Sequence, residues 1–287
     1  MNLLPFLVSG FGIGAVYALS GVGLTVLFKA SGTINFAFGA LGALAAHLMW
    51  SMVQHGSSQA FGMLVGVIVA AAVAFLYGYF VSPLLRERDS VVRSVATLGL
   101  TLILLGIMGL VWGEVPRRLI LGTDAYSISL LGARLNCTRM IALAIMFFGV
   151  IGIGLFLALS RLGLAMRAVA NDSKLSEILG VATRKVDTMA WVMSGTFAGL
   201  AGIFLANIVR LQPTFLTFLV IPAIAAAIVG RLTSLPGAAI GGLVIGLIEA
   251  VLSAFPDLAP YRSVTPYVVA VLFVAVSTPS QLAAAAT

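Results

Sequence analysis

The sequence predicts an all-α polytopic membrane protein with about eight to ten transmembrane helices, some of them short or broken. Hydrophobic residues make up 61% of the 287 residues, charged residues make up only 9%, and the mean hydropathy is +1.15. A soluble domain carries about 25% charged residues, so this chain lacks the polar surface that water requires. Apolar runs long enough to cross a bilayer also recur along the whole sequence. A soluble enzyme and a disordered chain are both excluded.

Nine apolar runs are candidates for membrane-spanning helices, each of which needs about 20 mostly apolar residues. The runs cover residues 4–28, 34–50, 62–85, 95–112, 140–159, 188–209, 215–230, 238–255 and 266–279. The run at 34–50 is short and the run at 215–230 contains Pro222, so either is expected to be broken or re-entrant. No charge precedes Lys29, so the first run is expected to remain as a membrane helix rather than to act as a signal sequence. No soluble domain fits between the runs, and residues 1–287 are expected to form one transmembrane domain.

Small residues spaced four apart recur within these runs. The pairs are Gly10/Gly14, Gly62/Gly66, Gly195/Gly199, Gly237/Gly241 and Gly242/Gly246. In a membrane, such pairs let two helix backbones approach closely, so the first interpretation is tight packing within the chain. The alternative is that some pairs line a transport pathway or a contact with another subunit.

The charge balance predicts how the chain is oriented in the membrane. The sequence has 16 Lys and Arg against 9 Asp and Glu, a net charge of +7. The basic residues stand singly between apolar runs, so the positive-inside rule explains them better than nucleic-acid binding does. With nine spans and the N-terminus outside, ten of the 16 basic residues face the cytoplasm. One cysteine, Cys137, and two separated histidines, His47 and His55, suggest neither a disulfide nor a metal site, and no cofactor is expected.

The connection at 160–187 carries a helical pattern of its own. Asn171 and Asp172 favour the start of a helix, and Gly180 favours its end. Three apolar residues between them have the i, i+3, i+4 spacing of one helix face: Leu175, Ile178 and Leu179. Two interpretations stay open on this pattern: a helix that binds a partner, or a solvated connector with a helical turn.

Several ordered motifs accompany this helix. Residues 163–172 read Gly-Leu-Ala-Met-Arg-Ala-Val-Ala-Asn-Asp, Gly180–Val181 follow, and residues 194–202 read Ser-Gly-Thr-Phe-Ala-Gly-Leu-Ala-Gly. Further motifs lie at residues 32–39, 83–86, 96–100 and 230–249. In this order the motifs resemble those of ABC-transporter inner-membrane permeases of the branched-chain amino acid uptake family, over nearly the whole chain. Phe38 departs from the family, which usually has His there, and this leaves the substrate open.

The resemblance implies a multi-pass permease of the cytoplasmic (inner) membrane that works with separate subunits. These are cytoplasmic ATP-binding subunits, a second related permease in a heterodimer or homodimer, and an extracytoplasmic solute-binding protein. It also implies that residues 160–187 form a cytoplasmic coupling loop whose helix docks in a groove of the ATPase. The coupling residues are Arg167, Asn171, Asp172, Lys174, Leu175, Glu177, Ile178, Leu179 and Gly180. The apolar members are expected to be buried by the ATPase, and Arg167, Lys174 and Glu177 to set orientation and charge complementarity.

The chain itself is not expected to be an enzyme. A phosphate-binding P-loop needs Gly-Lys followed by Ser or Thr, and none of the three lysines, Lys29, Lys174 and Lys185, follows a glycine. ATP hydrolysis is therefore expected from the partner, and no catalytic residue is assigned.

Polar and aromatic residues in the spans are candidates for a translocation pathway, because polar side chains in lipid are costly unless they are paired or functional. The candidates are Asn35, Phe36, Phe38, Thr97, Thr101 and Glu249. Plainer interpretations stand beside them. Asn35 would cap a helix or bond to another helix, and Thr97 and Thr101 would bond to their own helix. Glu249 would be an interfacial carboxylate paired with Arg262 or Arg210.

The predicted function is the passage of branched-chain amino acids, or a related small solute, through an ATP-driven importer in the lipid bilayer. One alternative is an importer of similar build for urea, an amide, or an aromatic or short-chain acid. The other is an ion-coupled secondary transporter, which would need paired carboxylates or a cation site within the membrane. The sequence offers only Glu249 for that purpose. No nucleic-acid partner is expected.

Overall fold

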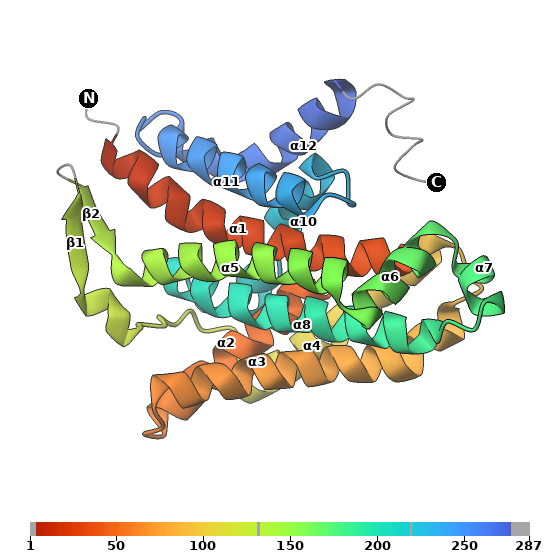
Figure 1. Cartoon of the computed structure of the whole chain (residues 1–287). Helices are drawn as coiled ribbons and strands as arrows, with labels where there is room; N and C mark the ends of the chain where they lie inside the picture. The colour runs from red at the N-terminus through yellow and green to blue at the C-terminus, as the bar shows by residue number, and fades with distance from the viewer. Residues whose placement is uncertain (1–3, 131–132, 219, 277–287) are drawn as a thin grey trace. The chain divides into compact units, whose positions relative to one another are not determined.

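The computed structural model describes residues 4–130, 133–218 and 220–276, and these residues are mostly helical (Figure 1). Within them, seven helices are long and apolar enough to cross a membrane: Pro5–Ser31, Gln59–Leu85, Ser90–Trp112, Cys137–Leu159, Thr183–Ile208, Leu235–Leu252 and Ala259–Val276. The two runs expected to be short or broken fall outside this set. Phe38–Gln54 has only 17 residues, and the helical residues 213–218 and 220–229 are likewise too short for the set. The predicted class, an all-α polytopic membrane protein, is confirmed.

The α-helices follow one another along the chain with short connections. They are α1 (Leu4–Ser31), α2 (Phe38–Gln54), α3 (Gln59–Leu76), α4 (Ser90–Trp112), α5 (Cys137–Leu159), α6 (Arg161–Asn171), α7 (Ser173–Ile178), α8 (Thr183–Ile208), α9 (Pro213–Phe218), α10 (Val220–Val229), α11 (Leu235–Leu252) and α12 (Thr265–Val276). A π-helical turn, η1 (Tyr77–Val81), and a 3-10 turn, η2 (Ser82–Leu85), extend α3. Two further 3-10 turns are η3 (Gly122–Ala125) and η4 (Ala259–Val264).

One feature of the fold is absent from the sequence prediction. Strands β1 (Ser127–Leu130) and β2 (Ala133–Asn136) pair antiparallel, with Ser127 opposite Asn136, in a connection that was expected to be merely polar. Cys137, expected in the same connection, is instead the first residue of α5. The hairpin is short, and four-residue strands give too little alternation to be recognised from sequence.

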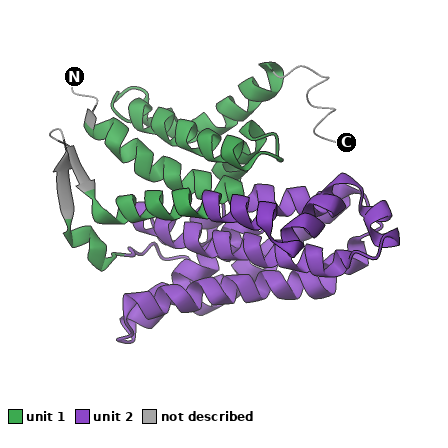
Figure 2. Ribbon diagram, in the orientation of Figure 1, with its two compact units in different colours: residues 1–22, 120–150, 221–287 green, residues 23–119, 151–220 purple. Residues whose placement is uncertain are grey.

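The chain forms two compact units (Figure 2). Unit 1 comprises Met1–Val22, Ile120–Val150 and Ile221–Thr287, and unit 2 comprises Gly23–Leu119 and Ile151–Val220. In unit 2, α2 is the central element, because every residue from Phe38 to His47 is buried. Helices α3 and α8 both pack against α2 and against each other.

Glycine determines how closely the helices of unit 2 approach. A Cβ atom at Gly202 of α8 would overlap the backbone of Gly42 in α2, and one at Gly66 of α3 would lie 2.5 Å from the carbonyl oxygen of Ala45. Helix α3 buries only a stripe of small residues with a period of four: Gly62, Gly66, Ala70 and Ala74. Its larger apolar side chains are mainly exposed, which is typical of a helix that faces lipid.

The helices of unit 1 are also packed closely at glycine residues. The first half of α1 packs on α11, where a Cβ atom at Gly14 would lie 2.9 Å from Cα of Leu243 and one at Gly242 would overlap the backbone of Ala18. Each of the five predicted small-residue pairs lies against another segment of its own unit. Tight packing within the chain is therefore confirmed as the interpretation of these pairs.

The connection at 160–187 is more helical than expected. It holds α6 and α7 where one short helix was predicted, and α8 begins at Thr183 rather than at 188. Only three residues of α6 are buried: Gly163, Met166 and Val169. A face this narrow is hard to distinguish from a polar connector in the sequence.

We expect Gly202→Ala to destabilise the protein, because the new methyl group would force α2 and α8 apart. Overpacking of this kind costs about 1–3 kcal/mol. Gly106→Ala in α4 is the matched control, since a Cβ atom there meets nothing within 4 Å. Alanine is the better helix former, so this control should be neutral or slightly stabilising. Thermal unfolding of both purified variants in detergent measures the difference; equal melting temperatures would contradict the packing described for Gly202.

Candidate functional site

Helix α6 turns the chain sharply away from the end of α5. The hydroxyl of Ser160 accepts a hydrogen bond from the amide of Gly163 at 2.8 Å and so caps α6. Gly163 lies directly against the last turns of α5, where a Cβ atom would collide with the carbonyl oxygen of Phe156. Met166 is almost fully buried on the same face of α6. Helix α6, which leads to α7, is therefore packed firmly against the end of α5.

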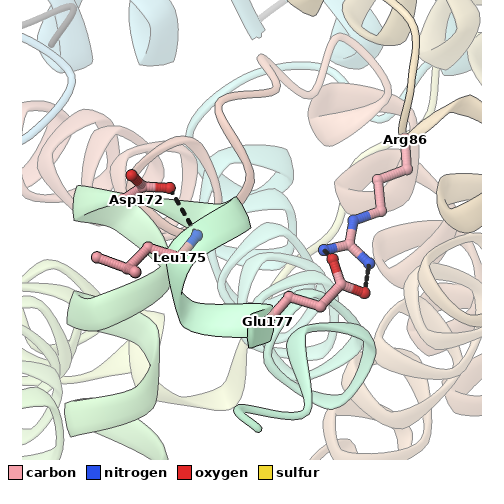
Figure 3. A network of polar contacts seen from close by, with 4 residues as sticks. All are labelled: Arg86, Asp172, Leu175 and Glu177. Atoms are coloured by element: carbon pink, nitrogen blue, oxygen red, sulfur yellow. Dashed lines mark hydrogen bonds and ion pairs between the residues drawn. The ribbon is translucent and has the colours of Figure 1, made fainter. Parts of the chain in front are cut away.

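Both predicted ends of α7 are confirmed. The carboxylate of Asp172 accepts a hydrogen bond from the amide of Leu175 at 2.9 Å, as Figure 3 shows. Gly180 has φ +82°, a left-handed conformation that favours glycine, and its amide donates to the carbonyl of Glu177 at 3.0 Å. The predicted cap belongs to Asp172, whereas Asn171 is the last residue of α6.

The apolar face of α7 points into solvent. Leu175 is 52% exposed, Ile178 is 82% exposed and Leu179 is 74% exposed, whereas Ser176 is buried on the opposite face. We call Leu175, Ile178 and Leu179 the apolar triad. Isolated large apolar side chains on a surface are common, but here two on α7 and one at its C-cap lie together outside the membrane-spanning helices, which makes them a candidate contact surface.

An ion pair joins α7 to the segment that follows α3. Nη1 and Nη2 of Arg86 donate to Oε1 and Oε2 of Glu177 at 3.2 and 2.9 Å, the two-pronged arrangement seen in Figure 3. Glu177 was expected to provide charge complementarity with a partner, and Arg86 was not among the predicted site residues. The structure gives Glu177 a partner within the chain. The two residues are 91 positions apart, so no local pattern could have paired them.

The first turns of α8 are fastened to the same segment. Nη2 of Arg184 donates to the carbonyl of Tyr79 at 3.0 Å, and the guanidinium lies 4.4 Å above the Tyr79 ring. The hydroxyl of Ser82 donates to Asp187 at 2.5 Å. Asp187 was expected at the end of the connection 160–187, but it lies inside α8. Together with Arg86, these contacts bind α7 and α8 to the η1–η2 segment.

The break between α1 and α2 is supported by α4. The amide of Ile34 donates to the hydroxyl of Ser94 at 3.0 Å, and the amide of Phe36 donates to the hydroxyl of Thr97 at 2.9 Å. The hydroxyl of Ser90 donates to the carbonyl of Gly32. Backbone groups outside a helix need other hydrogen-bond partners, so this row of α4 hydroxyls makes the break possible.

The candidate pathway residues on α4 have two roles in the structure. Thr97 donates to the carbonyl of Ser94 at 2.6 Å, and Thr101 donates to that of Thr97 at 3.1 Å, so the predicted bonds to their own helix are confirmed. Thr97 also accepts the Phe36 amide, which the sequence analysis did not foresee. Asn35 and Phe38 are both buried, while Phe36 is half-buried.

Glu249 belongs to unit 1, apart from the other candidates, which belong to unit 2. It is buried on α11 and accepts a hydrogen bond from the hydroxyl of Tyr17 on α1 at 3.0 Å. The structure gives this carboxylate a hydrogen-bond partner that the sequence did not suggest, Tyr17, while Arg262, one of the two suggested bases, interacts with its charge. A buried tyrosine hydroxyl can satisfy a carboxylate without placing a second charge in the membrane.

The architecture defines the class of protein: a polytopic helical membrane protein with a broken helix inside it and a short apolar-faced helix held outside the spans. The family model for the branched-chain amino acid transport system / permease component matches residues 6–277. The chain belongs to this family.

Similar proteins agree with this assignment. The high-affinity branched-chain amino acid transport system permease protein LivH of Escherichia coli is 25% identical over 285 residues, covering 92% of this chain and 90% of that protein. A probable branched-chain amino acid transport permease protein LivH of Methanocaldococcus jannaschii is 27% identical over 83% of this chain and 77% of that protein. The corresponding protein BraD of Pseudomonas aeruginosa is 25% identical over 87% of this chain and 86% of that protein.

We expect Arg86→Glu and Glu177→Arg each to loosen α7, and the double exchange to restore it. Partly exposed ion pairs contribute up to about 1 kcal/mol, so each single variant should speed hydrogen exchange of the α7 amides by up to about five-fold. Mass spectrometry of peptides covering residues 173–180 measures this effect. If the exchange rates in the double variant instead rise by the sum of the two single effects on the free energy of opening, the two side chains do not interact in solution.

Proposed function

We propose that this chain is the membrane-spanning permease subunit of an ATP-driven importer in the cytoplasmic membrane, and that its solute is a branched-chain amino acid or a related small molecule. The observation that carries the proposal is the apolar triad, exposed on a helix that is fixed to the rest of unit 2. Residues 160–187 then face the cytoplasm, and residues 1–287 act as one transmembrane permease domain.

The triad supports docking in a groove of a cytoplasmic ATP-binding subunit. A six-residue helix is unstable alone in water, so α7 depends on the Asp172 cap and the Arg86–Glu177 pair to keep its shape. A helix held in its bound conformation loses little entropy on docking. Asp172 and Glu177 are engaged within the chain, and Arg167 donates to the carbonyl of Ala158 at 3.3 Å, so the exposed Lys174 is the main charge presented to the partner. A groove with an apolar floor and an acidic rim fits this surface.

Helix α8 supplies a route from the docked helix into the membrane. Its first turns are bound to the η1–η2 segment through Arg184 and Asp187, and its later turns contact α2 at Gly202. Displacement of α7 therefore pulls on one continuous helix that reaches the centre of unit 2. Because the helices are closely packed at these glycines, a movement of α8 should displace α2 as well.

The remaining partners follow from the family. The sequence has no P-loop, so two separate ATP-binding subunits provide hydrolysis, and this chain needs no cofactor and is not an enzyme. A second related permease and an extracytoplasmic solute-binding protein complete the importer. Asn35, Phe36, Phe38, Thr97, Thr101 and Glu249 remain the candidates for the translocation pathway.

The relatives guide the choice of solute. LivH of Escherichia coli and BraD of Pseudomonas aeruginosa carry names that specify branched-chain amino acid transport, which favours that class here over urea, amides and other acids. Membership of the permease family also argues against the ion-coupled secondary transporter. ATP-dependent uptake of L-leucine by a reconstituted complex would support this assignment. Uptake of urea, an amide or another acid, without uptake of L-leucine, would support the alternative importer instead.

We expect Leu175→Asp or Ile178→Asp to release the ATP-binding subunit. Each buried Leu or Ile contributes about 1.5–3 kcal/mol, so loss of one should weaken assembly at least about 10-fold, and a buried unpaired carboxylate adds to the loss. Glu177→Gln should have a milder effect, because it leaves the triad in place. Co-purification of the ATP-binding subunit with each variant, together with L-leucine uptake, measures the result.

Val115→Asp is the control for these variants. Val115 is also strongly exposed. It lies just after the C-terminal end of α4, whereas Arg86 lies just before the N-terminal end of that helix. This variant should assemble and transport as the unmodified protein does. Full assembly and transport by Leu175→Asp and Ile178→Asp would show that α7 is only a connector.

A further inference from the structure

The break between α1 and α2 contains a fully buried asparagine with an unused hydrogen-bond donor. Asn35 is 0% exposed, and its Oδ1 accepts a hydrogen bond from the amide of Ala37 at 3.0 Å. Its Nδ2 has no hydrogen-bond partner among the residues that the structure describes. A buried donor without an acceptor destabilises a fold, so its retention here indicates an acceptor that arrives from outside the chain.

The unused donor lies beside the N-terminal end of α2. Because Nδ2 and Oδ1 share one carbon atom, the bond from Ala37 to Oδ1 holds Nδ2 at this end of the helix as well. No side chain caps α2, which has 17 residues and begins at Phe38. The first amides of a helix have no partner within it and carry a partial positive charge. A helix end of this kind, next to an amide donor, suits a carboxylate.

A group of opposite polarity lies at the same turn of α2. Gly39 is so close to Thr217 that a Cβ atom at Gly39 would collide with the Thr217 carbonyl oxygen. The Thr217 carbonyl is a hydrogen-bond acceptor, and its oxygen carries a partial negative charge. This carbonyl would repel a simple anion, but it can accept a hydrogen bond from an ammonium group. The pair of groups therefore fits a zwitterion.

We propose that Asn35 and the first turn of α2 bind the α-carboxylate of a zwitterionic amino acid during transport, while the Thr217 carbonyl accepts its ammonium group. The inference rests on the proposed function, which makes an amino acid the solute. Gly39 and Thr217 touch in the described conformation, so the site opens when α2 and α9 separate. Asn35 lies in a non-helical segment whose amides at Ile34 and Phe36 bond to α4 hydroxyls, so this movement does not require a helix to break.

Ligand-dependent stabilisation of the full-length chain in lipid nanodiscs tests the proposal. A ligand that binds the folded state raises the melting temperature in proportion to its affinity and concentration. Three probes differ in one group each: L-leucine, L-leucinamide, which lacks the carboxylate, and 4-methylpentanoate, which lacks the ammonium group. We expect L-leucine to stabilise the chain at concentrations at least about 10-fold lower than the other two, because each charged hydrogen-bonding group is lost outright.

Two variants of Asn35 separate binding from folding. Asn35→Ala should weaken L-leucine binding by at least about 10-fold. Asn35→Asp keeps an oxygen for the amide of Ala37 and so preserves the local fold, but it places a negative charge beside the carboxylate. This variant should reverse the preference, so that L-leucinamide stabilises it better than L-leucine does. Ser20→Ala is the control, since the buried Ser20 hydroxyl donates to the carbonyl of Val16 in its own helix, and L-leucine binding should not change.

Two results would overturn the inference: equal stabilisation by all three probes, or unchanged L-leucine preference in a folded Asn35→Asp variant. Absence of any L-leucine effect on a chain that still assembles with its ATP-binding subunit would also overturn it, while the importer assignment stands. Conversely, Asn35-dependent L-leucine binding by a chain that binds no ATPase supports the site and removes the ATP-driven mechanism.

Discussion

Close backbone contact at glycine is the constraint on which the rest of this structure depends. Apolar helix faces gain little by pairing in lipid, so helices associate where their backbones can approach. The contact of Gly42 with Gly202 holds α2 in the interior of unit 2. Because residues 38–47 are all buried, α2 also begins in the interior, and the chain reaches it through the non-helical segment 32–37. The hydroxyls of Ser94 and Thr97 then become obligatory partners for its amides.

The same packing joins the two parts of unit 2 that the proposed mechanism uses. Helix α8 contacts α2 through Gly202 and is fastened near its start through Arg184 and Asp187. The exposed triad of α7 and the broken segment before α2 are thus connected by one helix. A rigid connection of this kind converts movement at a protein surface into movement at a buried helix end. It also explains why α7 is fixed by the Arg86–Glu177 pair rather than left free.

Local features of the chain were predictable from sequence, and contacts between distant segments were not. The apolar runs, the Asp172 cap and the Gly180 stop depend on neighbouring residues, and the structure has them as expected. The bond from Phe36 to Thr97 joins residues 61 positions apart, and no periodicity reveals it. For Glu249 the sequence suggested an arginine partner but not the hydrogen bond from Tyr17, which lies 232 positions away. The break at 34–50 was visible as a short run, whereas its support by α4 was not.

In the assembled importer we place α7 in a groove of a cytoplasmic ATP-binding subunit. Site-specific photocross-linking in intact membranes tests it most directly, with a photoreactive residue in place of Ile178, the most exposed member of the triad. The account predicts a cross-link to the ATP-binding subunit from position 178 and none from position 115. A residue at 178 that cross-links only to lipid or to an extracytoplasmic protein, in membranes that contain the complete importer, would contradict it.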